Sequence, residues 1–227
     1  MTVTQLITAA FMLARFRYPE LHKTWNSISA RVGGLLPNSL LLSLVHRTGD
    51  LDMILRAMED DFSAPPEGAG EADWPADLLS DRYQLMLSEL WVGVVYEIFR
   101  LLTDYERKLA PDSDAIMALA HDLRLLRIPL EKHEIAADKK LSEPLLMQTY
   151  APNNNETDSY YYSKSDARRA YNMPSGVSSR GSVTWYVIDV KSQKSYWLER
   201  RALSERIVAL WGPVSPNGNL IPDDLKP

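Results

Sequence analysis

The chain contains no cysteine among its 227 residues and only four histidines. Without cysteine the protein forms neither a disulfide-stapled scaffold nor a metal site built on thiolates. A chain of this length does not need such staples, because it can bury roughly 70% of its unfolded surface in a core. The absence of cysteine fits a reducing compartment, and it leaves histidine, arginine and the carboxylates as the residues that could carry chemistry.

Long apolar runs are also missing, since no stretch approaches the ~18 consecutive apolar residues of a membrane-spanning helix. Residues 2–14 are largely apolar, but no basic segment precedes them. Arg15 and Arg17 follow where a signal peptide would have its cleavage site. We therefore interpret the start of the chain as an amphipathic helix, and we expect a cytoplasmic location with no membrane partner.

Positive charge is scarce in most of the chain. The net charge is −5, and residues 1–140 carry 15 basic and 21 acidic side chains, a net charge of −6. Residues 160–206 reverse this balance with 9 basic and 4 acidic side chains, a net charge of +5. The protein as a whole is therefore not a polycation built to coat nucleic acid. A nucleic-acid contact, if the chain makes one, is expected in this later segment.

The sequence also lacks the common short motifs of enzymes. It has no glycine-rich phosphate loop, no G-x-S-x-G elbow and no H-E-x-x-H zinc helix. The His121-Asp122 pair is typical of a helix surface rather than of a metal-dependent phosphohydrolase, whose site needs further ligands. We predict no cofactor and no metal site.

What is present predicts a mainly α protein. Six apolar side chains near the start recur three and four positions apart, which is typical of a helix with a buried stripe ending before Pro19. They are Val3, Leu6, Ile7, Ala10, Phe11 and Ala14. Residues 40–45 and 51–59 predict two further helices, because the Thr-Gly-Asp sequence between them offers a stop and a new N-cap. Residues 61–77, rich in proline and glycine, predict a loop.

Two long helices follow, over residues 82–109 and 114–141. Apolar residues at spacings of three and four give each helix a coiled-coil-like seam, and His133 occupies one position of the second seam. The short connection with Pro111 predicts an antiparallel pair. A second apolar face lies beside the seam of the first helix and consists of Trp91, Val95 and Phe99. This face fits either a partner protein or the N-terminal helices of the chain itself.

Helical periodicity is lost after the long pair. Residues 143–181 predict a polar linker or long loop, residues 183–190 and 195–198 a β-hairpin, and residues 202–211 a last helix. The expected fold is a helical bundle with a long antiparallel helix pair and a small C-terminal hairpin and helix. The expected divisions are a bundle (1–142), a linker (143–181), a hairpin-helix appendage (182–212) and a flexible tail (213–227).

Arg127 and His133 are the strongest catalytic candidates in the sequence. Five residues separate them, Pro129 among them, and this spacing resembles the Arg-x(4–6)-His motif of the HEPN superfamily of helical ribonucleases. The resemblance implies metal-independent RNA cleavage at a dimer interface, in which His133 moves a proton and Arg127 stabilises the developing phosphorane charge. Ile128 departs from the family pattern, in which a polar residue usually follows the arginine. In the alternative interpretation, His133 packs in the seam and Arg127 pairs with Glu131 one turn later.

Basic and aromatic residues alternate through residues 160–206. Nucleic-acid bases stack on aromatic rings while arginine and lysine hold phosphates. The candidate nucleic-acid-binding residues are Arg168, Arg169, Tyr171, Arg200 and Arg201. In the alternative interpretation, Trp185 and Trp197 form the buried face of the hairpin. Both faces of residues 183–190 are apolar, which favours burial of this strand over exposure of its side chains to a nucleic acid.

Taken together, these patterns favour a non-enzymatic protein-interaction or assembly protein built on a helical bundle, acting with a protein partner or by self-association. The alternative is a HEPN-like ribonuclease or a nucleic-acid-binding effector that uses Arg127 and His133. Whether the protein is an enzyme is left open between these two functions.

Overall fold

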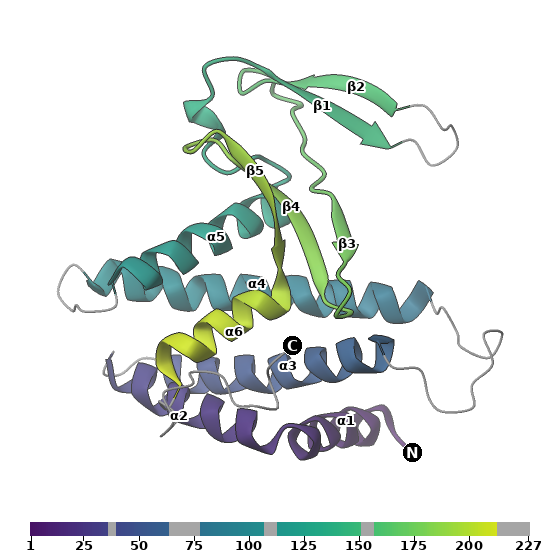
Figure 1. The fold of residues 1–227 in the computed structure, drawn as a ribbon, viewed down its shortest axis with the longest axis vertical. Helices are drawn as coiled ribbons and strands as arrows, with labels where there is room; N and C mark the ends of the chain where they lie inside the picture. Colours follow the sequence, from purple (N-terminus) through teal and green to yellow (C-terminus); the bar gives the residue numbers. More distant parts are fainter. Residues whose placement is uncertain (36–39, 64–77, 107–112, 151–156, 213–227) are drawn as a thin grey trace.

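The computed structural model describes residues 1–35, 40–63, 78–106, 113–150 and 157–212. They form an elongated molecule with stacked helices below and two small antiparallel sheets above (Figure 1). The helices are α1 (Val3–Arg17), α2 (Pro19–Leu35), α3 (Leu41–Ser63), α4 (Leu78–Glu106), α5 (Ser113–Lys132) and α6 (Arg200–Trp211). The strands are β1 (Leu145–Tyr150), β2 (Thr157–Tyr162), β3 (Ser175–Val177), β4 (Val183–Asp189) and β5 (Lys194–Glu199). The predicted mainly α fold with a C-terminal hairpin and helix is confirmed.

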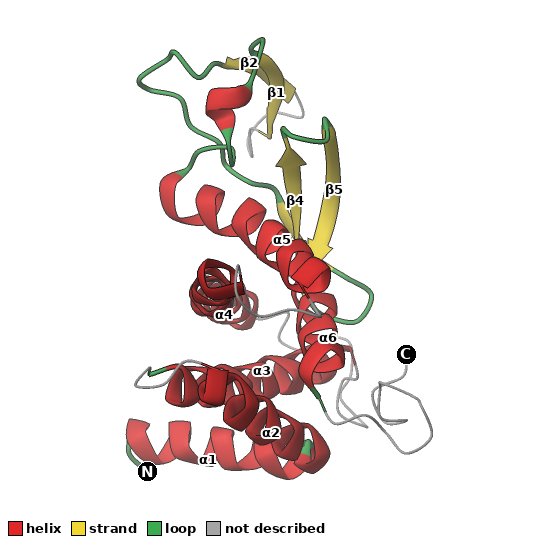
Figure 2. Ribbon diagram, turned by 90° about the vertical axis from the view of Figure 1, so that its left-hand side faces the viewer, coloured by secondary structure: helices red, strands yellow, loops and turns green. Residues whose placement is uncertain are grey.

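The helices lie in layers along the long axis, with α1 at one end, α2 and α3 next, then α4, and α5 nearest the sheets (Figure 2). α1 begins with a capping box, in which the Thr2 hydroxyl accepts from the Gln5 backbone N–H and the Gln5 side chain accepts from the Thr2 N–H. The buried stripe predicted for this helix is wrong. Ala14 alone is buried on α1, and Val3, Leu6 and Ile7 of the predicted stripe are exposed.

α3 is one continuous helix, so the predicted break between residues 45 and 51 is wrong. The glycine at the centre of that segment serves a close helix contact instead of a stop. A Cβ atom built on Gly49 would lie 2.5 Å from Cγ of Trp25 on α2, so only glycine fits there. The Trp25 indole Nε1 then donates to Asp52 Oδ2 at 3.0 Å, one turn further along α3.

α4 and α5 form the expected pair, and α5 runs back over α4 (Figure 1). The predicted seam is too long at its C-terminal end, because α5 ends at Lys132. Pro129 lies in the last turn, and His133 (φ 54°) and Ala137 (φ 61°) adopt the left-handed conformation, which cannot continue a helix. The Trp91, Val95 and Phe99 face is buried in the core of the chain itself. Residues 107–109 of the predicted pair lie outside the described residues.

The segment 143–181, predicted as a polar linker or loop, contains β1, β2 and β3. β1 pairs antiparallel with β2, and β4 lies between β3 and β5 in the second sheet. The register places Trp185 opposite Leu198 and Trp197 opposite Tyr186, so the two tryptophans lie on opposite faces of the hairpin. Trp185 is buried and Trp197 is exposed, which corrects the prediction that both form one buried face. Residues 61–63 of the predicted loop 61–77 belong to α3 instead. Residues 64–77 of that loop and the predicted tail 213–227 lie outside the described residues.

α6 is fixed to the bundle by a buried charge network. The Arg200 guanidinium is fully buried and pairs with Asp52 and Glu59 on α3, while Arg56 Nε donates to Asp52 at 3.1 Å. Such a cluster persists in a core only when each charge has an opposite partner. The network therefore places the C-terminal helix against the N-terminal half of the chain.

Candidate functional site

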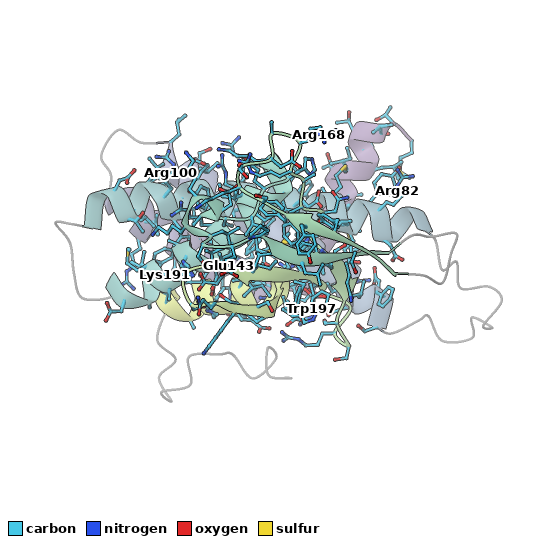
Figure 3. All side chains as sticks on the ribbon, turned by 90° about the horizontal axis from the view of Figure 1, so that it is seen from above. Arg82, Arg100, Glu143, Arg168, Lys191 and Trp197 are labelled. Atoms are coloured by element: carbon cyan, nitrogen blue, oxygen red, sulfur yellow. The ribbon has the colours of Figure 1, made fainter. Side chains whose placement is uncertain are left out.

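A groove of about 1160 Å³ lies between the two sheets at the upper end of the molecule. Its walls are β1 with the turn before it, residues 171–174, and the end of β4 with the start of β5. Figure 3 looks down on this end of the molecule, and Glu143, at the rim of the groove, lies near the middle of the view.

Two strand edges border the groove. Leu145, Leu146, Met147 and Gln148 of β1 line it consecutively. Side chains of a strand alternate between faces, so consecutive lining residues mean that the backbone edge itself faces the groove. β1 has β2 on one side and no strand on the other within the described residues. Across the groove, β3 pairs only with Val183–Trp185, so the rest of β4 has no strand on that side in the same residues.

The floor of the groove is apolar and firmly supported. Half-buried side chains from β1, from residue 173 and from the end of β4 pack there on a small second core. They are Leu145, Met147, Met173, Ile188 and Val190. Tyr162 lies at the centre of that core, where its hydroxyl accepts from the Ile135 N–H and donates to Asp138 Oδ2, both at 3.1 Å. These hydrogen bonds tie the β1–β2 hairpin to the turn after α5.

Two tyrosines fix the wall opposite β1. The Tyr171 hydroxyl donates to the Tyr186 carbonyl at 2.8 Å, and the Tyr160 hydroxyl donates to the Ala170 carbonyl at 3.2 Å. Burial raises the pKa of both phenols above the ordinary value, so both stay protonated near neutral pH. They are therefore hydrogen-bond donors that hold the backbone, and neither is suited to act as a base.

Charges at the groove balance one another. Lys140 and Lys194 are opposed by Glu143 and Asp189. Burial alone would raise the pKa of Asp189, but hydrogen bonds to its carboxylate, including one from the Lys191 N–H at 2.9 Å, hold that pKa below its ordinary value. The ring of His121 also meets this carboxylate, with Nε2 3.1 Å from Oδ2. A groove with this balance attracts neither phosphates nor strongly basic ligands.

Arg127 and His133, the predicted catalytic pair, have different environments. Arg127 pairs with Glu131 at 2.8 Å and Glu97 at 3.5 Å, and its guanidinium lies 4.9 Å from the ring centre of Tyr96. The Glu131 contact is the one that the alternative interpretation predicts. His133 is exposed, just beyond the end of α5, so it is not a packed seam residue.

The five predicted nucleic-acid-binding residues are not brought together on one surface. Arg200 and Tyr171 are buried, and Arg201 pairs with Asp60 at 2.8 Å. Arg169 pairs with Asp138 at 2.7 Å and with Glu134 at 2.8 Å. Arg168 is exposed and lies on the opposite side of the molecule from Trp197, the exposed aromatic residue of β5 (Figure 3). In the described residues, most of this positive charge is thus matched by carboxylates.

The residues of the groove were missed by the sequence predictions because most of them fall in the presumed linker. A signal was present, since the Tyr-Tyr-Tyr run at 160–162 has strong β propensity and residues 145–148 are mostly apolar. Within the described ranges, no three histidine or acidic side chains gather closely enough to hold a metal ion. None of the helices described combines the length and the apolar character needed to cross a membrane.

A scan against protein-family models finds no match to this chain, and neither a search of curated proteins nor a search of solved structures finds one.

Proposed function

We propose that this chain is a non-enzymatic protein-interaction protein, and that the groove between its two sheets binds an extended segment of a partner protein. The observation that carries the proposal is one backbone edge of β1, which has no strand beside it among the described residues and which lines a groove with an apolar floor along four consecutive residues. A strand edge has unpaired N–H and C=O groups, and an extended peptide satisfies them by adding one more strand.

The spacing of side chains along β1 supports the same ligand. Leu145 and Met147 are half-buried and point to the groove floor, while Leu146 and Gln148 are exposed. A peptide strand beside β1 would place every second side chain on this floor. The ligand best matched to the groove is therefore an uncharged stretch with apolar residues at alternating positions.

The size and the charge of the groove favour a peptide over a small molecule. Pockets for small ligands enclose roughly 300–1,000 Å³ and cover most of the ligand. This groove is larger, at about 1160 Å³, and runs between two sheets rather than into the interior. Its balanced charges, with Lys140 against Glu143 and Lys194 against Asp189, suit a neutral backbone better than an anionic cofactor.

A selection experiment with peptides tests the proposal. Short random peptides displayed on phage are selected on the immobilised full-length protein, and the selected sequences are synthesised for calorimetry. We expect apolar residues at alternating positions. We also expect N-methylation of every second backbone nitrogen to weaken binding about tenfold or more in one of the two registers, because each lost hydrogen bond costs about 1 kcal/mol.

Two groove variants and one matched control make the test specific. Asn172→Trp adds bulk from an exposed position of the groove wall, and Met147→Lys puts a charge on the floor. Met117→Lys makes the same chemical change on an exposed position of α5 away from the groove. Both groove variants should abolish binding, and Met117→Lys should preserve it. Peptides that bind all three variants equally, or that tolerate N-methylation in both registers, would contradict the proposal.

The ribonuclease alternative stays a prediction from the Arg127–His133 spacing. The exposure of His133 leaves its imidazole accessible to a substrate. Within the described residues we find no contact between this imidazole and Arg127, and Arg127 is paired with two carboxylates.

A further inference from the structure

α1 carries a large apolar surface that nothing in the described part of the chain covers. It forms the lower end of the molecule, and the other helices lie above it (Figures 1 and 2). Six of its large apolar side chains are between 49% and 84% exposed: Val3, Leu6, Ile7, Met12, Leu13 and Phe16. Soluble monomers rarely expose contiguous apolar patches larger than a few hundred Å², so a surface of this kind marks an interaction site.

Four of the exposed apolar residues form an ordered stripe. Leu6, Ala9, Leu13 and Phe16 are all exposed and follow one another at spacings of three, four and three, which places them along one face of the helix. The opposite face is the one that packs on the bundle. It contains the buried Ala14, and Arg15 donates to both carboxylate oxygens of Asp50 on α3, at 2.9 and 2.7 Å. These contacts therefore hold α1 on the bundle with its exposed stripe facing outward.

We propose that this stripe is a dimer interface, in which α1 packs against α1 of a second copy of the chain. The inference is independent of the groove at the other end of the molecule, so either can fail alone. A two-fold axis sets the same face on both sides of the contact, and a helix stripe with heptad-like spacing is self-complementary in that arrangement. Antiparallel pairing also brings the N-terminus of each helix dipole next to the C-terminus of the other.

The area of the stripe matches what a dimer needs. A large apolar side chain has on the order of 150–250 Å² of surface. Leu6, Leu13 and Phe16 of the stripe, with Met12 beside them, therefore present roughly 500 Å² on one protomer, and about 1,000 Å² when two copies meet. That total is close to the minimum area expected of a specific protein interface.

The charges around the stripe favour a second copy over a membrane surface. Helices that lie on membranes combine an apolar face with a face rich in lysine and arginine. Residues 1–14 contain no charged side chain, so two copies of the stripe meet without repulsion. The two arginines at the end of the helix are already matched, Arg15 by Asp50 and Arg17 by Asp61 at 2.6 Å, and the acidic Asp60 lies beside them. The arginines at this end are therefore already neutralised and offer little attraction to anionic lipids.

Sedimentation equilibrium of the full chain at micromolar concentration tests the proposal. We expect a mass of twice 25.8 kDa for the wild type. The variants Leu13→Asp and Phe16→Asp should raise the dimer dissociation constant about 100-fold or more. Their circular dichroism and melting temperature at low protein concentration should stay as in the wild type, because both side chains are exposed in the monomer. Met117→Asp, an equally exposed apolar position on α5, is the matched control and should remain dimeric.

Because the chain has no cysteine, single introduced thiols can test directly which face of α1 forms the dimer interface. Ala9→Cys and Thr8→Cys place a single thiol at neighbouring exposed positions of α1, on and off the stripe. A short bis-maleimide should cross-link the Ala9→Cys protein into a covalent dimer and the Thr8→Cys protein far less. A strictly monomeric wild type, a dimer that persists in both aspartate variants, or equal cross-linking at the two positions would overturn the proposal. A monomer that instead co-sediments with phosphatidylcholine–phosphatidylserine vesicles would overturn it in favour of a lipid surface.

Discussion

Arg200 at the start of α6 holds Glu59 of α3 with two hydrogen bonds, from Nε to Oε1 and from Nη2 to Oε2, both 2.8 Å long. The two residues are 141 positions apart and both are fully buried. Arg200 also pairs with Asp52, and its guanidinium lies 5.5 Å from the ring centre of Trp91. Because this arginine contacts α3 and α4 at once, it links the last helix to the rest of the bundle.

Removing Glu59 from this pair should destabilise the protein strongly. Glu59→Ala leaves Arg200 buried with only Asp52 as a carboxylate partner, and we expect a loss of about 3–5 kcal/mol in the free energy of unfolding. Urea denaturation measures this loss. Glu20→Ala is the matched control, because Glu20 pairs with Lys23 on the exposed surface of α2, and such pairs contribute about 0–1 kcal/mol. Similar losses in the two variants would contradict the structural role of the network.

The same network predicts sensitivity to acid. Burial would raise the pKa of Asp52, but Arg56 and Arg200 hold it at about 2, below the ordinary value of 3.8. A carboxyl whose pKa is lowered by folding stabilises the protein above its unfolded pKa and loses that effect as the pH falls through the folded pKa. We expect Asp52 to contribute about 2 kcal/mol that is present at pH 5 and lost between about pH 4 and pH 2.

Urea denaturation at a series of pH values measures this change. Asp52→Asn removes the titrating group. The variant should be less stable than the wild type at pH 5, but its free energy of unfolding should fall less between pH 4 and pH 2. Parallel curves for the two proteins would show that other carboxyls cause the acid sensitivity.

Two glycine-to-alanine changes should shift the melting temperature in opposite directions. Alanine is favoured over glycine in a helix by about 1 kcal/mol. In Gly49→Ala this gain is outweighed, because the new methyl group would meet the Trp25 ring at 2.5 Å, and overpacking typically costs 1–3 kcal/mol. In Gly93→Ala the nearest atom is Glu131 Oε1 at 3.9 Å, so the gain should be retained. Melting temperatures of the two variants check the prediction, and stabilisation in both would mean that α2 and α3 do not cross so closely.

His133 separates the two candidate functions. As an interaction protein, the purified chain should leave labelled single-stranded RNA intact at low salt. The ribonuclease alternative predicts cleavage that His133→Ala abolishes without unfolding the protein. Because φ of His133 is 54°, His133→Gly should raise the free energy of unfolding by about 0.5–1 kcal/mol, and this change tests the turn independently of any activity. RNA cleavage that depends on His133 would replace the function proposed above.

Sequence patterns predicted correctly those helices and strands that depend on residues close together in the chain. The hairpin of β4 and β5 follows from alternating β-branched and aromatic residues, and the α4–α5 pair follows from repeated apolar spacing. The groove was not predicted, because its walls come from β1, residues 171–174 and β4, which meet only after the chain has folded back. Among its residues, Tyr171 stood out in the sequence as a candidate for stacking on bases, yet its ring is buried and its hydroxyl holds the Tyr186 carbonyl.

The sequence by itself determined the mainly α architecture, the lack of thiol chemistry and the places where most helices and the hairpin form, because these depend on residues within one or two turns of each other. Only the tertiary structure decided which apolar faces are covered and which charges are free. Val3, Leu6 and Ile7 of α1 look like part of a core stripe in the sequence and are exposed, whereas Arg200 looks like a surface cation and is buried. The physical reason is that burial and ion pairing depend on distant neighbours such as Glu59, which no local pattern contains.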